Sequence, residues 1–565
     1  MNIYIDLINV KKNLMFIIYI LFNIFLVSSL FIFDYGYLYV SFFIFAGHVR
    51  DTFAIIVVIL KNIGDFIVKN VYKILYKNKF SSVRPLTNHK NIIYSLIPVY
   101  NEDSDMVTKN LDSLVSQKLP SSTINVMLLI FDGVNDKNKE LFESINKIID
   151  YDQESVNGGE SRSYYSWKAS DKCKLNIREG KYKNVRIIVV RKLINKGKKD
   201  SLIVGESIIS DMYSDEYDII YSYEEEVNTN NAFIYHTDGD TIADENCLAE
   251  LLSTMSKDDK IDAVSSLIRV YKRDGTYGKA WAFSVMQDFQ YFYSLMIRRM
   301  AESLFSSTTC LPGCSNMVRI NKRSSKAIKN YENIPKASEG LLQTVTRMQG
   351  TDRRYTTLLM REGGKLKMNY RAVAFTEPPL DVGSFIRQRR RWSSNSFFNS
   401  ITMLYSSNVN MYVKFSSFID ICRMFSTIFR LFSYIIFWYF FDGKLSTVNL
   451  IMVFIFLVFP YCYCFILAIF LVPNWFNMVL GFIMNKIFMP ILSVTSISKM
   501  YMTATNFDWG FKPSSIVETV INEEEDEEEK ISENDIRVEQ DSVNREIGTI
   551  MVNWKGKRWE MKEAN

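Results

Sequence analysis

Two aspartates separated by a single glycine follow a short apolar run near the middle of the chain. The run ends at Tyr235, and Asp238 and Asp240 come shortly after it in the sequence His-Thr-Asp-Gly-Asp-Thr. Carboxylates at the carboxyl end of a strand can point into the crevice where α/β sheets bind ligands. Their hard oxygens suit Mg²⁺ or Mn²⁺, and such an ion can bridge to the oxygens of a nucleotide diphosphate. An ordinary Asp-Gly turn explains the motif equally well when it is taken alone.

Polar side chains also follow three other apolar runs. Tyr100 and Glu102 come after the first run, Asp132 after the second, and Lys198 and Lys199 after the third. A nucleotide site in a doubly wound sheet needs such groups at the carboxyl ends of successive strands. The plainer alternatives are solvated loop cations for the two lysines and, for Glu102, a carboxylate near the positive end of a helix dipole.

A third candidate is an aspartate among arginines. Asp352 precedes Arg353 and Arg354. Neighbouring positive charge keeps a carboxylate ionised, as a general base must be at neutral pH. Taken alone, a structural ion pair or a helix cap is the more ordinary explanation of this motif.

Three arginines stand beside a tryptophan further along the chain, where residues 388–392 read Gln-Arg-Arg-Arg-Trp. Guanidinium forks bind phosphate through paired hydrogen bonds, and an indole stacks well on the C–H face of a sugar or on a cation. The motif therefore fits a site for a phosphate and a sugar. The alternative is a juxtamembrane basic cluster that attracts anionic lipid.

Cysteine and histidine offer less. Cys310 and Cys314 flank a Leu-Pro-Gly triplet, but no second pair with zinc spacing lies nearby. We therefore interpret this segment as a thiol-bearing loop, in which Gly313 permits a close backbone approach to a ligand. The chain has only three histidines and no evident Ser-His-Asp arrangement, which argues against hydrolase chemistry of that type.

The composition indicates a membrane protein that also carries a polar domain. Of the 565 residues, 48% are hydrophobic, 14% are aromatic and 23% are charged. That mixture fits apolar segments joined to a soluble domain, because an all-membrane bundle would hold fewer charges. The 67 basic and 62 acidic residues leave a net charge of only +5, which gives little support to nucleic-acid binding.

The candidate residues fall between about residues 91 and 391, where short apolar runs alternate with polar and helical stretches. Such runs are typical of buried strands, and strands that alternate with helices favour βαβ units and a mostly parallel sheet. The predicted strands are Ile92–Val99, Ile124–Phe131, Val185–Val190, Phe233–Tyr235 and Ile261–Leu267. We expect the polar segment 152–184 to be an inserted loop.

Two apolar segments precede this region. Leu14–Phe33 is as long as a helix that crosses the hydrocarbon core, and no small-residue cleavage site follows it, so an uncleaved span is favoured over a signal peptide. Tyr37–Leu60 is interrupted by His48, Arg50 and Asp51, so it predicts a span with a polar kink or a shorter span that starts after these residues. The lysines that follow favour a cytoplasmic location for the next segment.

The chain becomes apolar again after Trp392. Residues Ser393–Lys414 look amphipathic and are predicted to lie in the membrane interface. Pro460 and Pro473 could kink or divide the candidate spans that follow. These spans are about Phe425–Phe441, Val448–Val472 and Phe476–Val494. The acidic block Glu523–Glu529 in the tail is predicted to be solvated and mobile.

Taken in order, these motifs resemble those of the family 2 glycosyltransferases that polymerise sugars at membranes, and most closely those of the chitin synthases. The chain carries counterparts of that family's G-K-R-D-S, Q-x-F-E-Y, C-x-P-G-C, Q-R-R-R-W and D-x-F-S-W-G motifs. The matching segments are 195–201, 287–291, 310–314, 388–392 and 506–510. Two positions depart from the pattern, because Thr351 replaces the glutamate of E-D-R and Gln290 replaces the glutamate of F-E-Y.

The resemblance implies an α/β GT-A catalytic domain, with a nucleotide-sugar-binding and mostly parallel sheet, combined with an α-helical transmembrane domain. It implies a processive enzyme that adds N-acetylglucosamine from UDP-N-acetylglucosamine to the 4-hydroxyl of a growing β-1,4 chitin chain. The reaction would be a metal-assisted inverting displacement, with Mg²⁺ or Mn²⁺ as cofactor and export of the polymer through the protein's own spans.

The resemblance also implies where the protein works and with what. It would be a multi-pass protein of the plasma membrane whose catalytic domain lies in the cytosol. Its partners would be the sugar nucleotide, the growing chain and the lipid bilayer. The resemblance allows a homodimer and gives no role to nucleic acid.

Individual residues receive roles from the same resemblance. Those on the uridine side of the donor are Tyr100, Glu102, Asp132 and Lys198. Those on its diphosphate are Asp238, Gln388 and Arg391, and the metal ligands are Asp240 and Asp238. Those that face the acceptor are Trp392, Cys314 and Gly313. Asp352 would be the general base that takes the proton from the acceptor hydroxyl.

Three alternatives stay open at this point. One is a synthase of the hyaluronan or cellulose type, and another is transfer of a single sugar to a lipid carrier. The third is a membrane-anchored inactive scaffold, which the missing glutamate at Thr351 motivates. The predicted domains are a transmembrane hairpin with a basic linker (1–90), the GT-A domain (91–400), an interfacial helix with C-terminal spans (401–512) and an acidic tail (513–565).

Overall fold

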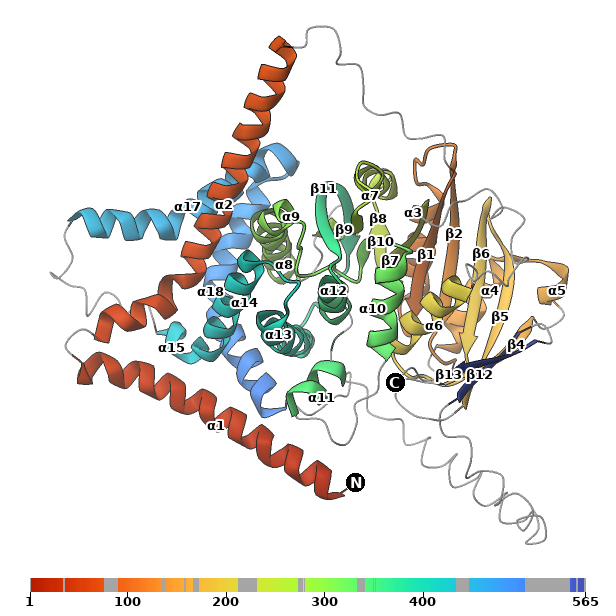
Figure 1. The fold of residues 1–565 in the computed structure, drawn as a ribbon, viewed down its shortest axis with the longest axis horizontal. Helices are drawn as coiled ribbons and strands as arrows, with labels where there is room; N and C mark the ends of the chain where they lie inside the picture. The colour runs from red at the N-terminus through yellow and green to blue at the C-terminus, as the bar shows by residue number, and fades with distance from the viewer. Residues whose placement is uncertain are drawn as a thin grey trace.

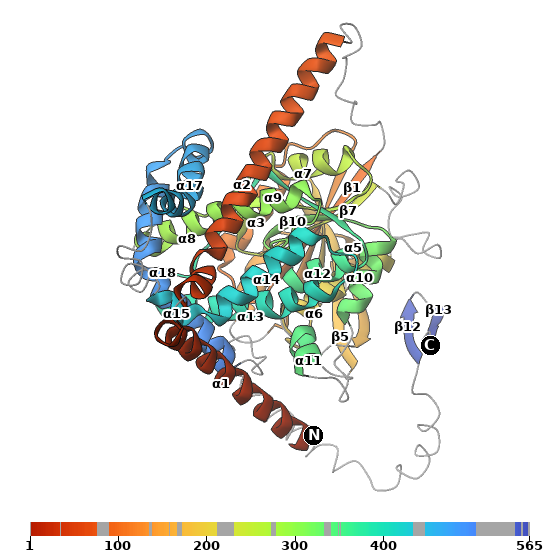
Figure 2. The ribbon, with the colours of Figure 1, turned by 60° about the vertical axis from the view of Figure 1, so that its left-hand side comes forward.

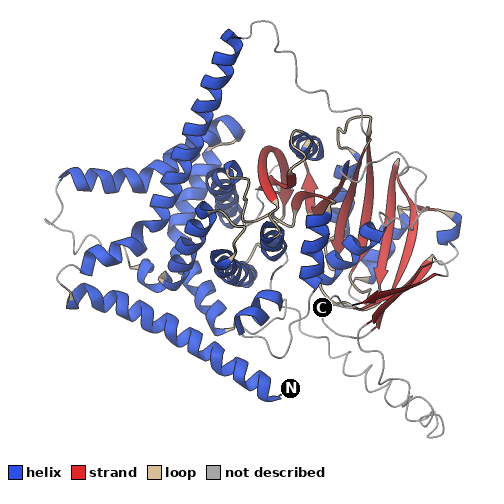
Figure 3. Ribbon diagram, viewed as in Figure 1, coloured by secondary structure: helices blue, strands red, loops and turns tan. Residues whose placement is uncertain are grey.

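The computed structural model of the chain has an α/β region on one side and long apolar helices on the other (Figure 1). It describes residues 2–33, 36–75, 90–134, 138–156, 159–165, 172–211, 231–272, 278, 280–332, 341–348, 350, 352–432, 447–503, 549–554 and 557–562. Apart from a separate hairpin near the C-terminus, the described strands lie in the α/β region, whereas helices occur in both parts (Figure 3).

The α/β region is built on one mixed, eleven-stranded sheet. Its strands are β1 (Asn91–Val99), β2 (Thr123–Phe131), β3 (Asp150–Tyr151), β4 (Glu160–Tyr165), β5 (Lys172–Tyr182), β6 (Val185–Lys192), β7 (Ala232–Thr237), β8 (Thr241–Ala243), β9 (Ile261–Val270), β10 (Ser315–Arg319) and β11 (Lys365–Thr376). Their order is β3-β5-β6-β2-β1-β7-β10-β9-β11-β8, with β4 beside β5. The five apolar runs that were predicted to be strands are all strands, so that prediction is confirmed.

The centre of the sheet is parallel and creates the crevice that a ligand site needs. β1 pairs in parallel with β2 on one side and with β7 on the other, and β2 pairs in parallel with β6. The chain therefore builds outward from β1 in one direction and later returns to its other side. At such a switch point the loops after the two strands diverge, and α/β sheets bind ligands there.

Helices cover both faces of this parallel centre. α3 (Ser104–Val115), α4 (Lys139–Lys147) and α7 (Cys247–Ser256) pack on one face, where Ile93 and Ile97 of β1 belong to their hydrophobic cluster. α6 (Lys198–Asp211) packs on the other face against Tyr94 and Leu96. Because β1 is buried on both faces, it reads as a continuous apolar run.

The prediction of a loop over residues 152–184 is wrong. The segment holds the short helix α5 (Gln153–Val156) and the strands β4 and β5, and β5 pairs antiparallel with β6 along eight residues from Leu175 to Tyr182. These strands extend the edge of the sheet and are largely polar, since an edge strand does not need the continuous apolar run of a central one. A search for apolar runs therefore misses them.

Several helices connect the sheet to the apolar helices. They are α8 (Trp281–Tyr293), the π-helix η3 (Ser294–Arg299), α9 (Met300–Leu304), α10 (Lys322–Glu332), α11 (Leu341–Met348), α12 (Asp352–Arg361) and α13 (Val382–Tyr405). α13 begins at Asp381, whose side chain accepts a hydrogen bond from Ser384 N and caps the helix. The predicted amphipathic segment from Ser393 is therefore not a separate element, since it continues the helix that carries residues 388–392.

The remaining described helices belong to the apolar part of the chain. They are α1 (Asn2–Ile32), α2 (Gly36–Leu75), α14 (Met411–Phe425), α15 (Thr427–Leu431), α17 (Thr447–Leu471) and α18 (Phe476–Met502), and α2, α17 and α18 gather with α8 in Figure 2. Four helices in the described part of the chain are long and apolar enough to cross a membrane. These segments are Asn13–Ile32, Val40–Phe66, Phe454–Leu471 and Phe476–Met502.

The predicted spans agree with these helices in part. Tyr37–Leu60 lies in one continuous helix that includes its polar residues. Pro460 lies inside α17, and Pro473 lies in the turn before α18. Of the predicted span Phe425–Phe441, residues up to 432 belong to α14 and α15 or the turns beside them, and the rest lies outside the described residues. Residues 506–510 and the acidic block also lie outside them, and a β12–β13 hairpin (Thr549–Trp554, Lys557–Lys562) closes the described chain.

Candidate functional site

The Asp-Gly-Asp turn lies at the carboxyl end of β7, at the switch point of the sheet. Asn110 of α3 is fully buried beneath it, and its amide donates hydrogen bonds to Asp238 O (3.2 Å) and Thr237 Oγ1 (3.4 Å). The side chain of Asp238 forms an ion pair with Lys198 at the start of α6. The turn is therefore braced from below, and its first carboxylate faces the loop that precedes α6.

Carboxylates crowd this turn. Burial raises the pKa of Asp240 to about 8, and the nearby charges of Asp238 and Glu102 add to that effect. Burial also raises the pKa of Glu102, with a smaller contribution from Asp238. Lys198 is the nearest cation, and burial works against its charge, but Asp238 and Asp352 together raise its pKa. An additional cation would relieve the repulsion among these carboxylates.

The donor set suits a hard divalent ion only in part. Asp238 and Asp240 offer carboxylate oxygens, which Mg²⁺ and Mn²⁺ prefer. Among the described residues, however, no group of three or more histidine, cysteine, aspartate or glutamate side chains is arranged to hold a metal. A divalent ion at this turn would need oxygens from water or from a bound diphosphate to complete its shell, as Mg²⁺ sites on phosphate substrates usually do.

Asp132 and Glu102 shape the neighbouring loops. Asp132 is 3% exposed, and its Oδ1 accepts hydrogen bonds from Lys192 Nζ (2.6 Å) and Lys196 N (3.1 Å). Lys192, at the end of β6, is fully buried and also pairs with Asp200 at 2.6 Å. The carboxylate of Asp132 therefore fastens the loop before α6. A lysine at the end of an apolar strand was the sequence signal for Lys192, and the prediction omitted it.

Glu102 turns back onto its own loop. Its Oε2 accepts hydrogen bonds from Tyr100 N (2.6 Å) and Asn101 N (3.0 Å). Asn138 donates to Tyr100 O and Gly133 O, both at 2.8 Å, and so joins the loop after β1 to the loop after β2. Tyr100 is thus held beside the carboxylate cluster by contacts of its backbone.

Asp352 is the first residue of α12, and its charge acts on Lys198, the ion-pair partner of Asp238. The loop that ends at Cys314 passes directly against Asp352, because a Cβ atom on Gly313 would lie 2.3 Å from Asp352 Oδ1. The predicted close approach at Gly313 is therefore to this carboxylate. Burial raises the pKa of the Cys314 thiol, and the charges of Asp238, Asp352 and Asp240 act in the same direction, which places the thiol among the three carboxylates.

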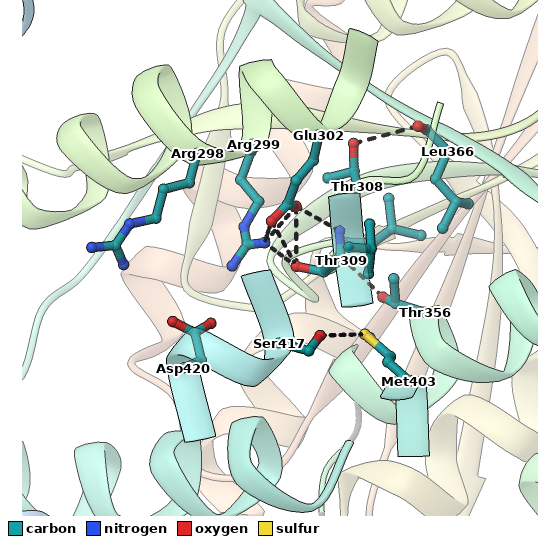
Figure 4. Close-up of polar contacts among 12 residues, drawn as sticks. Arg298, Arg299, Glu302, Thr308, Thr309, Thr356, Leu366, Met403, Ser417 and Asp420 are labelled. Atoms are coloured by element: carbon teal, nitrogen blue, oxygen red, sulfur yellow. Dashed lines mark hydrogen bonds and ion pairs between the residues drawn. The ribbon is translucent and has the colours of Figure 1, made fainter. Parts of the chain in front are cut away.

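Hydrogen bonds to α9 and α12 hold the loop that ends at Cys314 (Figure 4). Glu302 of α9 accepts from Thr309 N (2.8 Å) and pairs with Arg299 at 2.5 Å. Leu311 N donates to Thr356 Oγ1 of α12 at 3.0 Å. The loop and the helix that carries Asp352 are therefore tied together. No spacing of residues in the sequence predicts these contacts, because the partners come from three separate elements. Cys310 and Cys314 are both free thiols.

A small cavity adjoins Asp352. Its lining residues are Leu202, Glu206, His236, Leu311, Gly313, Asn316, Tyr331, Asp352 and Tyr355. His236 contacts Glu206 Oε1 through Nε2 and Asn316 Oδ1 through Nδ1, both at 3.0 Å. This histidine is buried with two partners, so it belongs to the wall of the site.

The three consecutive arginines of α13, residues 389–391, have three different surroundings. Arg389 is half-buried and lies over Trp392 (4.3 Å to the ring centroid) and Phe385 (4.7 Å), and its Nη2 donates to Gln290 Oε1 at 2.8 Å. Arg390 donates to Thr503 Oγ1 at 2.9 Å, at the end of α18.

Arg391 interacts electrostatically with the carboxylates of the site. Burial and Arg390 lower its pKa, while Asp352 and Asp238 counteract that shift. Gln388 Oε1 is buried and has no hydrogen-bond partner in the described part of the chain. The indole of Trp392 is 43% exposed and tilts against Tyr291 at 6.1 Å. One face of α13 therefore offers a cation, an unpaired amide and an open aromatic ring.

The structure thus brings most of the predicted residues together. Asp238, Asp240, Lys198, Asp352, Cys314 and Arg391 are linked by electrostatic interactions. Glu102 acts on Asp240 in the same way, and Gly313 lies against Asp352. Asp132 differs from these residues, because its carboxylate already pairs with the fully buried Lys192. Thr351 lies outside the described residues.

Comparison of the sequence with models of known protein families shows which family this chain matches. A family model described as chitin synthase matches residues 180–544. That range holds the Asp-Gly-Asp turn, the thiol-bearing loop, Asp352 and residues 388–392, and it excludes the loops that carry Tyr100, Glu102 and Asp132.

Curated relatives agree with the family model. A protein named chitin synthase 8 from Gibberella zeae is 24% identical over 443 residues, which is 74% of this chain and 65% of the relative. Another chitin synthase 8, from Verticillium dahliae, is 23% identical over 58% of this chain and 59% of its own length. Chitin synthase 5 from Zymoseptoria tritici is 26% identical over 59% of this chain and 19% of its own length. The chain therefore spans less than two thirds of the length of these relatives.

Solved structures resemble the chain only distantly. The mannosyltransferase PcManGT from Pyrobaculum calidifontis, in complex with GDP-Man and Mn²⁺, matches 77% of this chain and 99% of its own length, with 11% identity and a TM-score of 0.38. At that similarity we take nothing from it about the ligands of this chain.

Proposed function

The chain belongs to the chitin synthase family, and we propose that it extends a β-1,4-linked chain of N-acetylglucosamine, with UDP-N-acetylglucosamine as donor. The observation that carries the proposal is that Lys198 forms an ion pair with Asp238 and is also acted on by Asp352 from a different element, so that both carboxylates raise its pKa. An inverting displacement needs a site for the leaving diphosphate on one side of the sugar and a base on the other. Those two carboxylates, on separate loops, are the candidates for these positions.

The donor side would consist of the Asp-Gly-Asp turn and α13. Asp238 and Asp240 would hold a divalent ion, Mg²⁺ or Mn²⁺, which when bound stabilises negative charge on the diphosphate. The crowded carboxylates support this, since burial, Asp238 and Glu102 raise the pKa of Asp240 to about 8 even though Lys198 opposes the shift. Arg391 would contact the diphosphate, and Gln388 would use its unpaired amide oxygen on the donor. Lys198 would help to hold the leaving group.

Tyr100 and Glu102 would border the uridine from the loop after β1, and Asp132 would shape that side through its contact with the loop before α6. The acceptor side would consist of Asp352, the loop at Gly313 and Cys314, and Trp392. Asp352 would take the proton from the 4-hydroxyl as that oxygen attacks the sugar carbon. The open face of Trp392 would stack on an acceptor sugar, as indoles commonly do.

The apolar helices would serve the product. A polymer rich in hydroxyl groups cannot dissolve in hydrocarbon, because unpaired polar groups there cost several kcal/mol each. We therefore place the chain in the plasma membrane as a multi-pass protein, with the catalytic domain in the cytosol and a path for the polymer among its own spans. The four apolar helices support the membrane location.

Product analysis tests the proposal. The purified full chain is incubated with Mg²⁺ or Mn²⁺ and, in separate reactions, labelled UDP-N-acetylglucosamine, UDP-glucose and UDP-glucuronic acid. We expect a long polymer from the first donor alone, and we expect chitinase to digest it. A polymer from another donor would indicate a hyaluronan- or cellulose-type synthase, and a single-sugar lipid would exclude the polymerase.

Variants of the two assigned carboxylates complete the test. Asp352→Asn and Asp240→Ala should each abolish polymer formation while the thermal unfolding midpoint stays near that of the parent chain. If both variants keep the parent's activity, the assigned mechanism is wrong. If the parent chain is itself inactive with donor and metal, the inactive scaffold is the better description.

A further inference from the structure

A group of charged side chains joins α2 to the helices packed against it. Arg50 is 1% exposed and pairs with Asp51 of its own helix at 3.1 Å and with Asp420 of α14. Asp51 also accepts hydrogen bonds from Arg298 Nε of η3 (3.0 Å) and from Tyr293 OH (2.9 Å). These two arginines and two aspartates balance each other in charge. Arg298 and Asp420 lie on the same side of the region drawn in Figure 4.

Arg423 adds a positive charge that this group does not balance. It lies one turn beyond Asp420 on α14, and its guanidinium packs against α2, where a Cβ atom on Gly47 would lie 1.4 Å from Arg423 Nη1. In the part of the chain that the structure describes, its guanidinium makes no hydrogen bond or ion pair. Burial and the positive charges of Arg430, Arg298 and Arg50 lower its pKa to about 9, with Asp51 opposing them.

Two more polar atoms beside Arg423 lack partners. Arg50 Nη2 and His48 Nδ1 are buried without a hydrogen bond to any described residue. Arg50 Nη2 can only donate, and His48 Nδ1 donates in one tautomer. Buried donors of this kind are rare in native proteins, and an unoccupied donor often marks a missing partner. Together with Arg423 they form a patch of donors and positive charge, which suits an oxyanion.

The position of this patch indicates what kind of molecule carries the oxyanion. Gly47, His48 and Arg50 belong to the candidate span Val40–Phe66. Gly47 follows Val40 by seven residues, about 10 Å along a helix axis. Arginine side chains in spans extend toward the headgroup level, and basic pockets between spans bind phosphorylated lipid headgroups. An unbalanced charge at this depth is costly unless it is paired.

We propose that Arg423, together with Arg50 Nη2 and His48, binds a phosphate group, and that an anionic phospholipid seated between α2 and α14 supplies it. The site is separate from the candidate donor site, and the proposal does not depend on sugar transfer. Gly47 is required because only a residue without a side chain leaves room for the guanidinium.

Lipid binding to the purified full chain tests the proposal. Native mass spectrometry and thermal unfolding in neutral detergent are compared after addition of phosphatidic acid, phosphatidylglycerol, phosphatidylcholine or inorganic phosphate. We expect the two anionic lipids to bind saturably and raise the unfolding midpoint. Phosphatidylcholine should not, because its choline compensates the phosphate charge. If inorganic phosphate alone reproduces the shift, the site takes the free ion and the lipid assignment is overturned.

Matched variants locate the site. Arg423→Gln should raise the half-saturating concentration of anionic lipid at least tenfold, and Gly47→Ala should do the same because it displaces the guanidinium without removing its charge. Lys61→Met is the control, since Lys61 lies exposed on the same helix and pairs only with Asp65 among described residues. Equal loss in the control would indicate non-specific attraction and overturn the proposal.

Phosphate could also bind at the candidate donor site, so a further variant separates the two sites. Arg391→Gln lacks the cation of the donor site, and phosphate that this variant still binds is therefore bound elsewhere. If Arg423→Gln and Gly47→Ala fail to fold, the parent chain alone still tests the proposal. When phosphatidic acid or phosphatidylglycerol is added to the lipid-free parent chain and neither remains bound in native mass spectra, the chain has no such site.

Discussion

The backbone of Gly313 lies directly against the carboxylate of Asp352. A side chain at position 313 would have its Cβ 2.3 Å from Asp352 Oδ1 and 2.7 Å from its Cγ, closer than real Cβ contacts allow. The loop cannot simply move away, because Leu311 N is hydrogen-bonded to Thr356 of the same helix. The glycine therefore sets how near the thiol-bearing loop comes to the assigned base.

The substitution Gly313→Ala tests this relationship. The new methyl group should displace the Asp352 carboxylate, and a displacement of about 1 Å at a reacting group can reduce the rate about 100-fold. We expect polymer formation to fall by that order while donor binding changes little. Initial rates and donor affinity of the purified chain provide the measurement.

Gly64→Ala is the matched control for that change. Gly64 lies in α2 with nothing within 4 Å of its Cβ position, so alanine should be accepted there with full activity. If Gly313→Ala is as active as Gly64→Ala, the contact with Asp352 has no bearing on catalysis.

Lys192 is expected to matter for stability. It is fully buried and pairs with Asp132 and Asp200 at 2.6 Å each, so Lys192→Met leaves two buried carboxylates without their cation. Breaking a buried pair in this way typically costs about 3–5 kcal/mol of unfolding free energy. The thermal unfolding midpoint in detergent should fall clearly. Lys109→Met, at an exposed ion pair with Asp105, should leave it unchanged.

Much of the central sheet could be predicted because its strands are buried on both faces. β1, β2 and β6 appear in the sequence as largely apolar runs, and their ends located the candidate loops. β4 and β5 could not be found in that way, because edge strands alternate polar with apolar residues. Their pairing with β6 is a long-range contact that no local pattern records.

The site was predictable to the level of residue types and loops. Asp238, Asp240 and Asp352 stood out as carboxylates in recognisable motifs, whereas Lys192 and Asn110 did not. A lone lysine or asparagine becomes informative only when the fold buries it beneath a carboxylate or a turn. The different surroundings of the three neighbouring arginines also depend on the direction in which each side chain leaves α13 and on which elements pack against that helix.

Lys199 should make stability depend on pH. It is 2% exposed, and burial, together with Arg354 and Arg347, lowers its pKa from 10.5 to about 7. Between about pH 7 and pH 10.5 the unfolded chain still binds this proton and the folded chain does not, so stability rises with pH, by about 1.4 kcal/mol per unit.

The variant Lys199→Met isolates that contribution. The difference in unfolding midpoint between parent and variant should shrink as the pH rises from 7 to 9. The reason is that folding of the parent removes a proton from Lys199, and this step costs less free energy at higher pH. Lys118→Met, at an exposed ion pair with Glu245, should show no such trend. A difference between Lys199→Met and parent that stays constant with pH would contradict the buried, neutral amine.

The three consecutive arginines 389–391 of α13 should respond differently to the same substitution. Arg391→Gln removes the cation that faces Asp238 and Asp352, so donor turnover should fall about 100-fold with little change in the unfolding midpoint. Arg390→Gln loses a contact with Thr503 at the end of α18 and should stay within about threefold of the parent rate. Arg389→Gln removes a guanidinium stacked on Trp392 and bonded to Gln290, so it should mainly lower the unfolding midpoint.

This series also separates the two explanations of the basic motif. A juxtamembrane cluster that attracts anionic lipid acts through summed charge, so each substitution would weaken binding to anionic vesicles by a similar amount and leave turnover alike in all three. A diphosphate site acts through one guanidinium in one orientation, so Arg391→Lys should restore only part of the rate, because an ammonium group cannot reproduce the paired hydrogen bonds of the fork. Equal kinetic losses at Arg390 and Arg391, measured on folded protein, would contradict the assignment of Arg391 alone to the donor.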